Sequence, residues 1–405
     1  MNTFIQGGVT APEGFKASGI HCGIRRNKSK LDLALILSTV PCATAAAYTM
    51  NKVKGAPILV TKQNIKDGYS QAMICNSGNA NTCNADGIEI AKQCCTLLAN
   101  ATGLKATDIV IASTGVIGQP LSLEPFITGI PEAVAALSID GGTQAAEAIM
   151  TTDTHLKEYA ISFEIDGITC KMGVMCKGSG MINPNMATML TFITTDVAIS
   201  PSMLNFALQA EVKESLNQIS VDGDTSTNDM VSIMANGLAN NALISEENNH
   251  YKIFCQALHH ICSWVARQIA TDGEGATKLL VCTVSQAPSK QVALDIAKSV
   301  ISSDLLKTAM FGEDANWGRV LCAIGYTQGD FCLDRVELTL KSAKGEILVC
   351  KNAAYHPFSE EIAAKILSEK EIDILINLHD GLHSGQAWGC DLSYEYVKIN
   401  GDYRS

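Results

Sequence analysis

The segment Lys177–Asp196 contains the residues of this sequence that are best suited to chemistry. It reads KGSGMINPNMATMLTFITTD and places several threonines among glycines, a proline and two asparagines. Gly178 and Gly180 permit positive φ and a close approach of the backbone, and Asn183-Pro184 favours a turn. This pattern is typical of a loop that holds a reactive geometry.

Thr188 is the candidate nucleophile of this loop. The small Ala187 precedes it, and a strained turn would press the Thr188 hydroxyl against the Ala187 carbonyl. Attack at that carbonyl gives an ester that water can open, and one product then begins at Thr188. Its new α-amine has a reference pKa of ~7.7–8.0, so it can act as a general base toward its own hydroxyl. The structural alternative is a β-branched residue at the start of a buried strand.

Two further loops accompany the nucleophile. Ser113–Gly118, STGVIG, follows an expected strand and offers backbone N–H groups and the Thr114 hydroxyl to an oxyanion. Val221–Asp229, VDGDTSTND, contains three carboxylates and three hydroxyls in nine residues. A calcium loop would need a glycine later than Gly223, so no metal site is expected. We interpret this stretch as a network of hydrogen-bonded turns beside the nucleophile.

Charge and glycine are also concentrated in two later stretches, DGEGATK at Asp272–Lys278 and FGEDANWGR at Phe311–Arg319. Each could grip a small polar ligand, and a solvated loop is the alternative for each. The sequence has no G-x-x-x-x-G-K-[ST] phosphate loop and no dinucleotide fingerprint. We therefore expect no nucleotide cofactor.

The elements that must position these loops are of α/β character. The first part has short aliphatic runs, and the later part has helical and strand patterns separated by turns. The aliphatic runs are Leu33–Leu37, Pro57–Val60 and Ile109–Ala112; helices are expected at Ile88–Ala99, Pro201–Ser215, Tyr251–Ala270 and Ser289–Ser302; a hairpin is expected at Ala160–Ile165 and Thr169–Cys176; strands are expected at Leu279–Val284, Arg335–Leu340 and Ile347–Cys350. The expected architecture is mixed sheets layered against helices.

Composition limits the class of protein. A chain of 405 residues allows two domains and perhaps three. A net charge of −11 argues against a nucleic-acid or anionic-membrane surface. The most apolar window, Leu31–Met50, is interrupted by Asp32 and Pro41 and predicts a buried strand and loop in place of a membrane span. Fifteen scattered cysteines and no signal-peptide pattern predict reduced thiols and a cytoplasmic location.

Taken together, these motifs closely resemble the glutamate N-acetyltransferase family of arginine biosynthesis, also called ornithine acetyltransferase. The resemblance spans nearly the whole chain. Its motifs are TAPEGF, NSGNANTC at Asn76–Cys83, STGVIG, KGSGMINPNMATML, VDGDTSTND, GEGATK, FGEDANWGR and the C-terminal YVKINGDYRS. The resemblance implies an N-terminal-threonine-nucleophile acyltransferase of α/β (α+β) fold that cuts itself between Ala187 and Thr188. The products would be two intertwined chains, an α chain of residues 1–187 and a β chain of residues 188–405.

The resemblance also implies roles for particular residues. Thr114 and Gly115 would form the oxyanion hole. The substrate would be bound by Thr154, Lys177, Thr188, Glu274, Asn400 and Ser405. Thr154 has two neighbours of the same type, Thr151 and Thr152, and a shift of one register would exchange them.

The implied reaction is a two-step acyl transfer. Acetyl would pass from N2-acetylornithine to Thr188 and then to glutamate, without a cofactor, and acetyl-CoA could serve as a second acetyl donor. The implied assembly is an α2β2 heterotetramer with no nucleic-acid or membrane partner. The alternatives are a self-cleaving N-terminal-nucleophile amidohydrolase or aminopeptidase, which would give the acyl group to water, and a noncatalytic binding protein in which Thr188 is structural.

Overall fold

The computed structural model describes residues 2–183 and 189–402, and these fall into two compact units along the chain. Unit 1 consists of Met1–Gly178, Asn185–Val212 and Thr225–Val265. Unit 2 consists of Ser179–Pro184, Lys213–Asp224 and Ala266–Ser405. Each unit therefore draws residues from both sides of the expected cleavage position.

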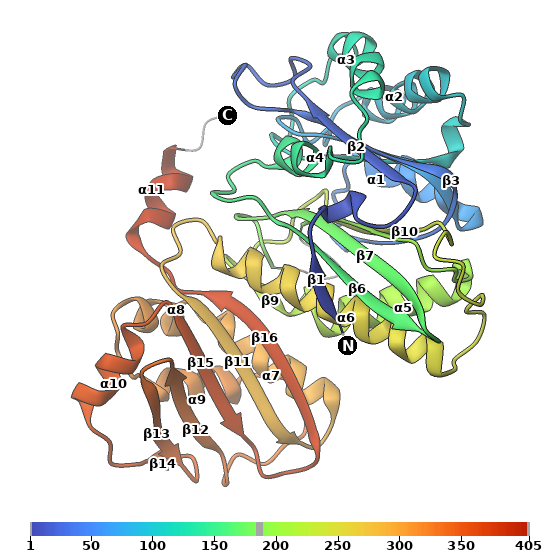
Figure 1. Cartoon of the computed structure of the whole chain (residues 1–405). Coiled ribbons are helices and arrows are strands. Elements are labelled where there is room, and N and C mark those ends of the chain that lie inside the picture. Colours follow the sequence, from blue (N-terminus) through green and yellow to red (C-terminus); the bar gives the residue numbers. More distant parts are fainter. Residues whose placement is uncertain (1, 184–188, 403–405) are drawn as a thin grey trace. The chain divides into compact units, whose positions relative to one another are not determined.

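A nine-stranded mixed sheet forms the centre of unit 1 (Figure 1). Its order is β1-β6-β7-β8-β10-β3-β4-β5, and β2 pairs with β3 outside this path. The strands are β1 Thr3–Ile5, β2 Phe15–Ile20, β3 Leu33–Tyr48, β4 Tyr69–Asn76, β5 Ile109–Ser113, β6 Glu158–Ile165, β7 Ile168–Lys177, β8 Leu190–Thr195 and β10 Met230–Ala235. The helices of this part are α1 Ala56–Asn64, α2 Gly87–Thr102, α3 Glu124–Ala135, α4 Gly142–Ile149, α5 Pro201–Glu214 and α6 Asn249–Thr271, of which the last two end in unit 2.

Alternating side chains of β4 divide the core of unit 1 into two layers. Ala72 and Ile74 pack with apolar residues of α2 and α3 on one face. Met73 and Cys75 point to the other face, where they pack in the cluster that contains residues of α4, β8 and β10. This period of two is what a strand covered on both faces requires.

A seven-stranded sheet forms the centre of unit 2, in the order β14-β13-β12-β15-β11-β16-β9. Figure 1 shows α7 and α9 behind this sheet, and both contribute to its apolar core. The strands are β9 Ile219–Ser220, β11 Leu279–Ala287, β12 Glu337–Ser342, β13 Gly345–Lys351, β14 Ala354–Tyr355, β15 Glu371–Asn377 and β16 His383–Cys390; the helices are α7 Lys290–Ile301, α8 Asp304–Phe311, α9 Trp317–Gly325, α10 Glu360–Leu367 and α11 Tyr394–Asp402.

Local sequence accounts for several of these boundaries. Ser289, Ser303 and Ser359 each accept a hydrogen bond from a first-turn N–H and so cap α7, α8 and α10. The aliphatic run Pro57–Val60 forms the start of α1, because proline fits the first turn of a helix. The predicted α/β class with layered mixed sheets is confirmed, as are the hairpin β6–β7 and the helices α2, α5, α6 and α7.

The loop expected within Leu31–Met50 is absent, because β3 continues through this window as one strand of 16 residues. The pairing of β3 with β4 shifts between Leu37 and Cys42. Pro41 lies within this irregularity, where no N–H donor is needed for the ladder.

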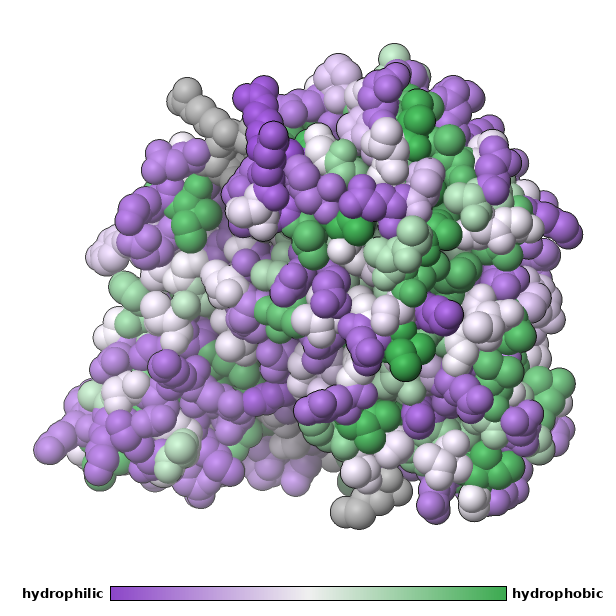
Figure 2. Space-filling model, turned by 45° about the horizontal axis from the view of Figure 1, so that its top comes forward, coloured by the Kyte–Doolittle hydropathy of each residue, from purple (hydrophilic) through white to green (hydrophobic). Residues whose placement is uncertain are grey.

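On the face drawn in Figure 2, hydrophobic residues reach the surface among hydrophilic ones. In the part of the chain that the structure describes, no helix has both the length and the apolar composition that a bilayer span needs.

Candidate active site

The STGVIG loop follows β5 and turns sharply at Gly115. The Thr114 N–H donates to the Asn76 carbonyl at 2.9 Å. Gly115 has a φ of +127°, and a Cβ there would lie 2.4 Å from the carbonyl carbon of Gly78. Only glycine fits this turn. With the Thr114 N–H committed, the donors that the turn offers to an oxyanion are the Thr114 hydroxyl and the Gly115 N–H.

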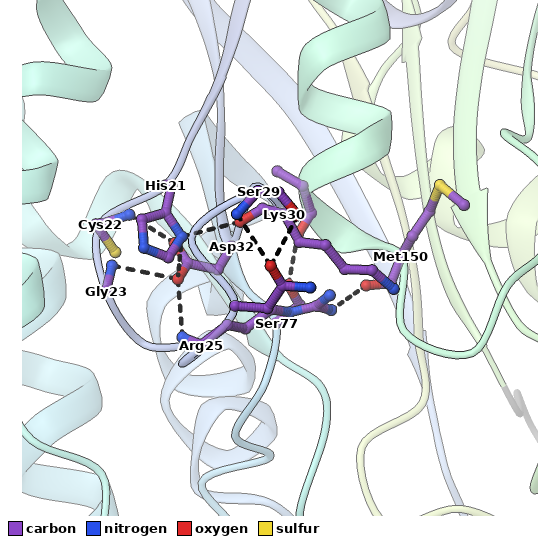
Figure 3. A network of polar contacts seen from close by, with 11 residues as sticks. His21, Cys22, Gly23, Arg25, Ser29, Lys30, Asp32, Ser77 and Met150 are labelled. Atoms are coloured by element: carbon purple, nitrogen blue, oxygen red, sulfur yellow. Dashed lines mark hydrogen bonds and ion pairs between the residues drawn. The ribbon is translucent and has the colours of Figure 1, made fainter.

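The NSGNANTC motif begins at the end of β4 and is hydrogen-bonded to the backbone of Asp32, a residue whose buried carboxylate binds a separate loop (Figure 3). Asp32 accepts hydrogen bonds from the backbone N–H groups of Cys22, Gly23 and Arg25 at 2.7, 3.2 and 2.9 Å. The backbone carbonyl of Asp32 accepts from the Ser77 N–H at 2.9 Å. Asp32 thus fixes both a surface loop and the start of the motif.

Three asparagines connect this motif to the STGVIG loop and to the chain before β10, two through their side chains and Asn79 through its backbone. We call Asn76, Asn79, Asn228, Ser113 and Thr114 the amide framework. The Asn76 Oδ1 accepts from the Ser113 hydroxyl at 2.6 Å, and the Asn79 backbone forms isolated bridges with residues 114 and 116. Asn228 donates to the Ser113 carbonyl at 3.0 Å. The framework lies entirely within unit 1.

Met189 is the first described residue after the expected cleavage position, and it leads into β8. The Met189 carbonyl accepts from the Met230 N–H at 2.9 Å, and Leu190 pairs with Met230 in the parallel β8–β10 ladder. Ala187 and Thr188 lie outside the described residues, so the predictions of cleavage and of the nucleophile stay predictions.

Thr154 and Lys177, the two predicted substrate-binding residues of unit 1 that the structure describes, lie close in the chain to members of a polar cluster around Asp153. Lys177 ends β7, and Thr154 follows Asp153 directly. Asp153 accepts from the Lys157 ammonium at 2.7 Å, from the Gly178 N–H at 2.8 Å and from the Thr151 N–H at 2.9 Å. One carboxylate therefore ties the TTDT segment to the start of the KGSG segment.

The charge of Asp153 is set by its neighbours. Burial alone would raise the pKa of this carboxyl, but the ammonium groups of Lys177 and Lys157 hold the pKa well below its usual range. Thr154 itself is exposed, with its hydroxyl 3.5 Å from His155 Nδ1. The role of Thr154 in substrate binding stays a prediction, and Thr151 and Thr152 stay its alternatives.

The VDGDTSTND segment forms the hydrogen-bonded turns that the sequence predicts. In unit 2, Asp222 accepts from the N–H groups of Met181 and Ile182 at 2.6 and 2.8 Å. In unit 1, the Thr49 hydroxyl donates to the Ser226 carbonyl at 2.7 Å. The polar groups of the segment therefore form hydrogen bonds with several separate parts of the chain.

Asp229, at the end of this segment, is a buried carboxyl in unit 1. Its Oδ2 atom has no hydrogen-bond partner among the described residues. Burial raises the pKa of this carboxyl well above its usual value. Burial therefore disfavours the charged form of Asp229.

In unit 2 the structure brings together Glu274 and Asn400, two of the predicted substrate-binding residues. The Asn400 amide donates to Glu274 Oε2 at 2.8 Å. Gly180 lies against this carboxylate, since a Cβ there would be 2.4 Å from its atoms, and the Glu274 N–H donates to the Ser179 carbonyl at 3.0 Å. We call Gly180, Glu274 and Asn400 the Glu274 corner. Ser405, the last predicted member, lies outside the described residues.

Glu274 and Lys278, four residues apart in DGEGATK, form no ion pair with each other among the described contacts. Lys278 is buried and lies 3.3 Å from Glu313 Oε1, and its ammonium also donates to the Leu367 carbonyl. In the FGEDANWGR stretch, Asn316 caps α9 by accepting from the Arg319 N–H at 3.2 Å. That motif therefore has a structural role at a helix start.

Sequence reasoning missed Asp153 and Asn228 as members of the candidate site. A carboxylate four residues before a lysine in TTDTHLK could have indicated the Asp153–Lys157 pair. For Asn228 no comparable local signal exists, because its partners come from distant parts of the chain.

The model of the ArgJ family matches residues 16–405 of this chain. The chain is 47% identical over 402 residues to the arginine biosynthesis bifunctional protein ArgJ of Caldanaerobacter subterraneus subsp. tengcongensis, covering 99% of each chain. It is 48% identical over 404 residues to the protein of the same name from Symbiobacterium thermophilum, covering 99% of this chain and 100% of that protein.

Among solved structures, that of the arginine biosynthesis bifunctional protein ArgJ from Bacillus halodurans matches with a TM-score of 0.50 and 46% identity. The match covers 52% of this chain and 98% of that one. The family expected from the motifs is confirmed: this chain belongs to the ArgJ family of arginine-biosynthesis enzymes.

Proposed function

We propose that this protein is a self-cleaving acyltransferase that moves acetyl from N2-acetylornithine to glutamate through an acetyl ester on Thr188. The proposal includes cleavage between Ala187 and Thr188. The observation that carries it is the Glu274 corner, where a carboxylate and an amide are held 2.8 Å apart beside a glycine. Membership of the ArgJ family supports the same reaction.

The chemistry of the first half-reaction follows from the groups available. The Thr188 hydroxyl would attack the acetyl carbonyl carbon, and its proton would go to the Thr188 α-amine. The negative charge on the carbonyl oxygen would be stabilised by the Thr114 hydroxyl and the Gly115 N–H. The C–N bond would then break as the α-ammonium returns its proton to the leaving amine of ornithine. Glutamate would reverse these steps and leave as N-acetylglutamate.

Charge explains how the substrates would be recognised. Ornithine and its acetyl derivative carry a side-chain ammonium, which Glu274 would hold by a charge-assisted hydrogen bond. Lys177 would attract a substrate carboxylate, and Asn400 would keep the Glu274 carboxylate in place through the bond between them. Thr154 and Ser405 complete the proposed binding set.

The remaining parts of the proposal concern partners. We propose that the reaction needs no cofactor, that acetyl-CoA can act as a second donor, and that the products of cleavage form an α2β2 heterotetramer in the cytoplasm. The relatives from Caldanaerobacter subterraneus and Symbiobacterium thermophilum are named bifunctional proteins, which supports a second donor.

The test combines intact mass with acceptor dependence. The purified protein should separate under denaturing conditions into fragments that end at Ala187 and begin at Thr188, and Thr188→Ala should stay whole and inactive. Acetyl transfer from N2-acetylornithine should require glutamate. Acetate release of equal rate without glutamate would instead indicate an amidohydrolase, and a single full-length species in an active preparation would overturn self-cleavage.

A further inference from the structure

The side chain of Asn228 is the most highly connected polar group of the amide framework. It is 6% exposed and lies two residues before β10. Its Nδ2 donates to the carbonyls of Ala80 and Ser113 at 2.5 and 3.0 Å. Its Oδ1 accepts from the hydroxyls of Thr82 and Thr227 at 2.5 and 2.6 Å. Both donors and both lone pairs of the amide are therefore used.

This arrangement demands an amide at position 228. Two carbonyls can only accept, so the group that faces them must donate twice, and an aspartate at this position would oppose its oxygens to theirs. Gly55 packs against the same side chain, since a Cβ there would lie 2.5 Å from Nδ2. The backbone of Gly55 thus blocks movement of the Asn228 amide toward it.

The contact with Ser113 sets the orientation of one peptide unit. The carbonyl of Ser113 accepts from Asn228, and the N–H of the same peptide, that of Thr114, donates to the Asn76 carbonyl at 2.9 Å. A peptide is planar, so fixing its two polar groups fixes the plane. The Thr114 hydroxyl and the Gly115 N–H lie on the residues that directly follow this peptide, so a rotation of the plane would displace both.

The other end of the connection is the strand next to the proposed nucleophile. Two residues after Asn228, Met230 donates its N–H to the Met189 carbonyl at 2.9 Å and pairs with Leu190. Thr188 lies outside the described residues but is joined to Met189 by a peptide bond. Asn228 therefore links the start of β8 to the STGVIG loop through contacts within one unit.

We propose that Asn228 is a positioning residue that sets the STGVIG loop relative to the start of β8. It acts through Thr114 and Gly115 and touches no substrate. This inference rests on the proposed function, because the oxyanion role of the loop belongs to it.

The test replaces the amide without changing its size. Asn228→Asp should lower kcat for acetyl transfer by about 10²-fold, since a small misplacement of a catalytic group can cost that much, and should leave KM within about threefold. Asn241→Asp is the matched control. Asn241 is also 6% exposed in unit 1, and its hydrogen bonds to the described part of the chain go to backbone groups of residues 198 and 242, at 2.8–3.2 Å. The kcat of Asn241→Asp should stay near that of the wild type at temperatures where both variants are folded.

A double variant separates positioning from general damage. If Asn228 acts through Thr114, the losses of Asn228→Asp and Thr114→Ala should not add, and the double variant should be about as slow as the slower single variant. Additive losses, or an Asn228→Asp turnover no lower than that of Asn241→Asp, would overturn the proposal.

Two further measurements keep the test decisive. Should Asn228→Asp fail to fold, Thr82→Val removes only one of the four hydrogen bonds and should still reduce kcat several-fold; an unchanged kcat would count against the proposal. Failure of the proposed function would look different, because Thr114→Ala alone would then leave turnover unchanged.

Discussion

The amide framework of unit 1 and the Glu274 corner of unit 2 hold their functional groups in different ways. In the framework, buried neutral amides bond mostly to backbone carbonyls and hydroxyls, as Asn228 does with residues 80 and 113. In the corner, a partly exposed carboxylate meets Asn400, which lies on α11, a helix without buried residues.

The difference indicates a division of labour. Groups that must hold one geometry in every step gain from burial and from a complete set of hydrogen bonds, because a fully satisfied buried network is rigid. Groups that must admit one substrate and release another gain from exposure and adjustable side chains. The following predictions test this division, beginning with the largest expected effect.

Loss of the Asp153 carboxylate should be the most damaging change in unit 1. Asp153→Asn leaves the fully buried Lys157 ammonium without its carboxylate partner, and breaking such a pair costs about 3–5 kcal/mol. Chemical denaturation should show this loss. Glu371→Gln, which breaks the exposed Arg267–Glu371 pair, should cost no more than about 1 kcal/mol. Equal losses for the two variants would contradict the importance of the buried pair, and adding Lys157→Met should restore part of the stability lost in Asp153→Asn.

Removal of the Thr114 hydroxyl, the proposed oxyanion donor, should affect catalysis more than stability. Thr114→Ala should slow acetyl transfer by about 10²–10³-fold and should slow self-cleavage as well, because both pass through a negatively charged oxygen. Single-turnover rates and the time course of fragment masses measure the two effects. A variant that keeps both rates would exclude Thr114 from the site.

Changes in the Glu274 corner should alter substrate recognition and leave processing intact. Glu274→Gln removes one charge-assisted bond worth about 1.5–3 kcal/mol, so kcat/KM for N2-acetylornithine should fall by about 10–100-fold. Gly180→Ala should produce the same kinetic change, because its Cβ would lie 2.4 Å from the carboxylate. Glu395→Gln, on the exposed face of α11, is the control with expected wild-type kinetics. Incomplete cleavage in Glu274→Gln would show that the corner also serves processing.

The smallest expected effect concerns the pH dependence of stability. Because burial raises the pKa of Asp229, the folded state retains a proton that the unfolded state releases above its ordinary pKa of ~3.9. Stability should therefore decline as pH rises from about 4 toward the folded-state pKa. In Asp229→Asn this contribution is gone, so the melting temperature should fall less between pH 4 and pH 7 than in the wild type. Parallel curves for the two proteins would show that Asp229 is ionised in the folded state.

The sequence predicts the local part of this structure well. The helix α2 and the hairpin β6–β7 follow from apolar spacing and an Asp-Gly turn, which act over a few residues. The motifs also identify Thr114 and Gly115 as neighbours of the candidate site, and the structure places them in one turn.

Long-range pairing could not be read from the sequence in the same way. The four partners of Asn228 include Ser113, Ala80 and Thr82, which are 115, 148 and 146 residues away in the chain. Likewise, β9 and β10 are joined by one short segment but belong to different sheets. Periodicity describes which face of an element is apolar, and it does not say which distant backbone carbonyl a buried amide will meet.

The antiparallel pairing of β7 with β8 would determine how the protein refolds if the chain is cut as proposed. Six residue pairs join these strands, from Met172↔Thr195 to Lys177↔Leu190, and a cut before residue 188 would leave the two strands on separate polypeptides. Before the cut, refolding is a first-order event within one molecule. Afterwards it becomes an encounter between two molecules whose yield depends on their concentration, so scission would make unfolding effectively one-way in dilute solution.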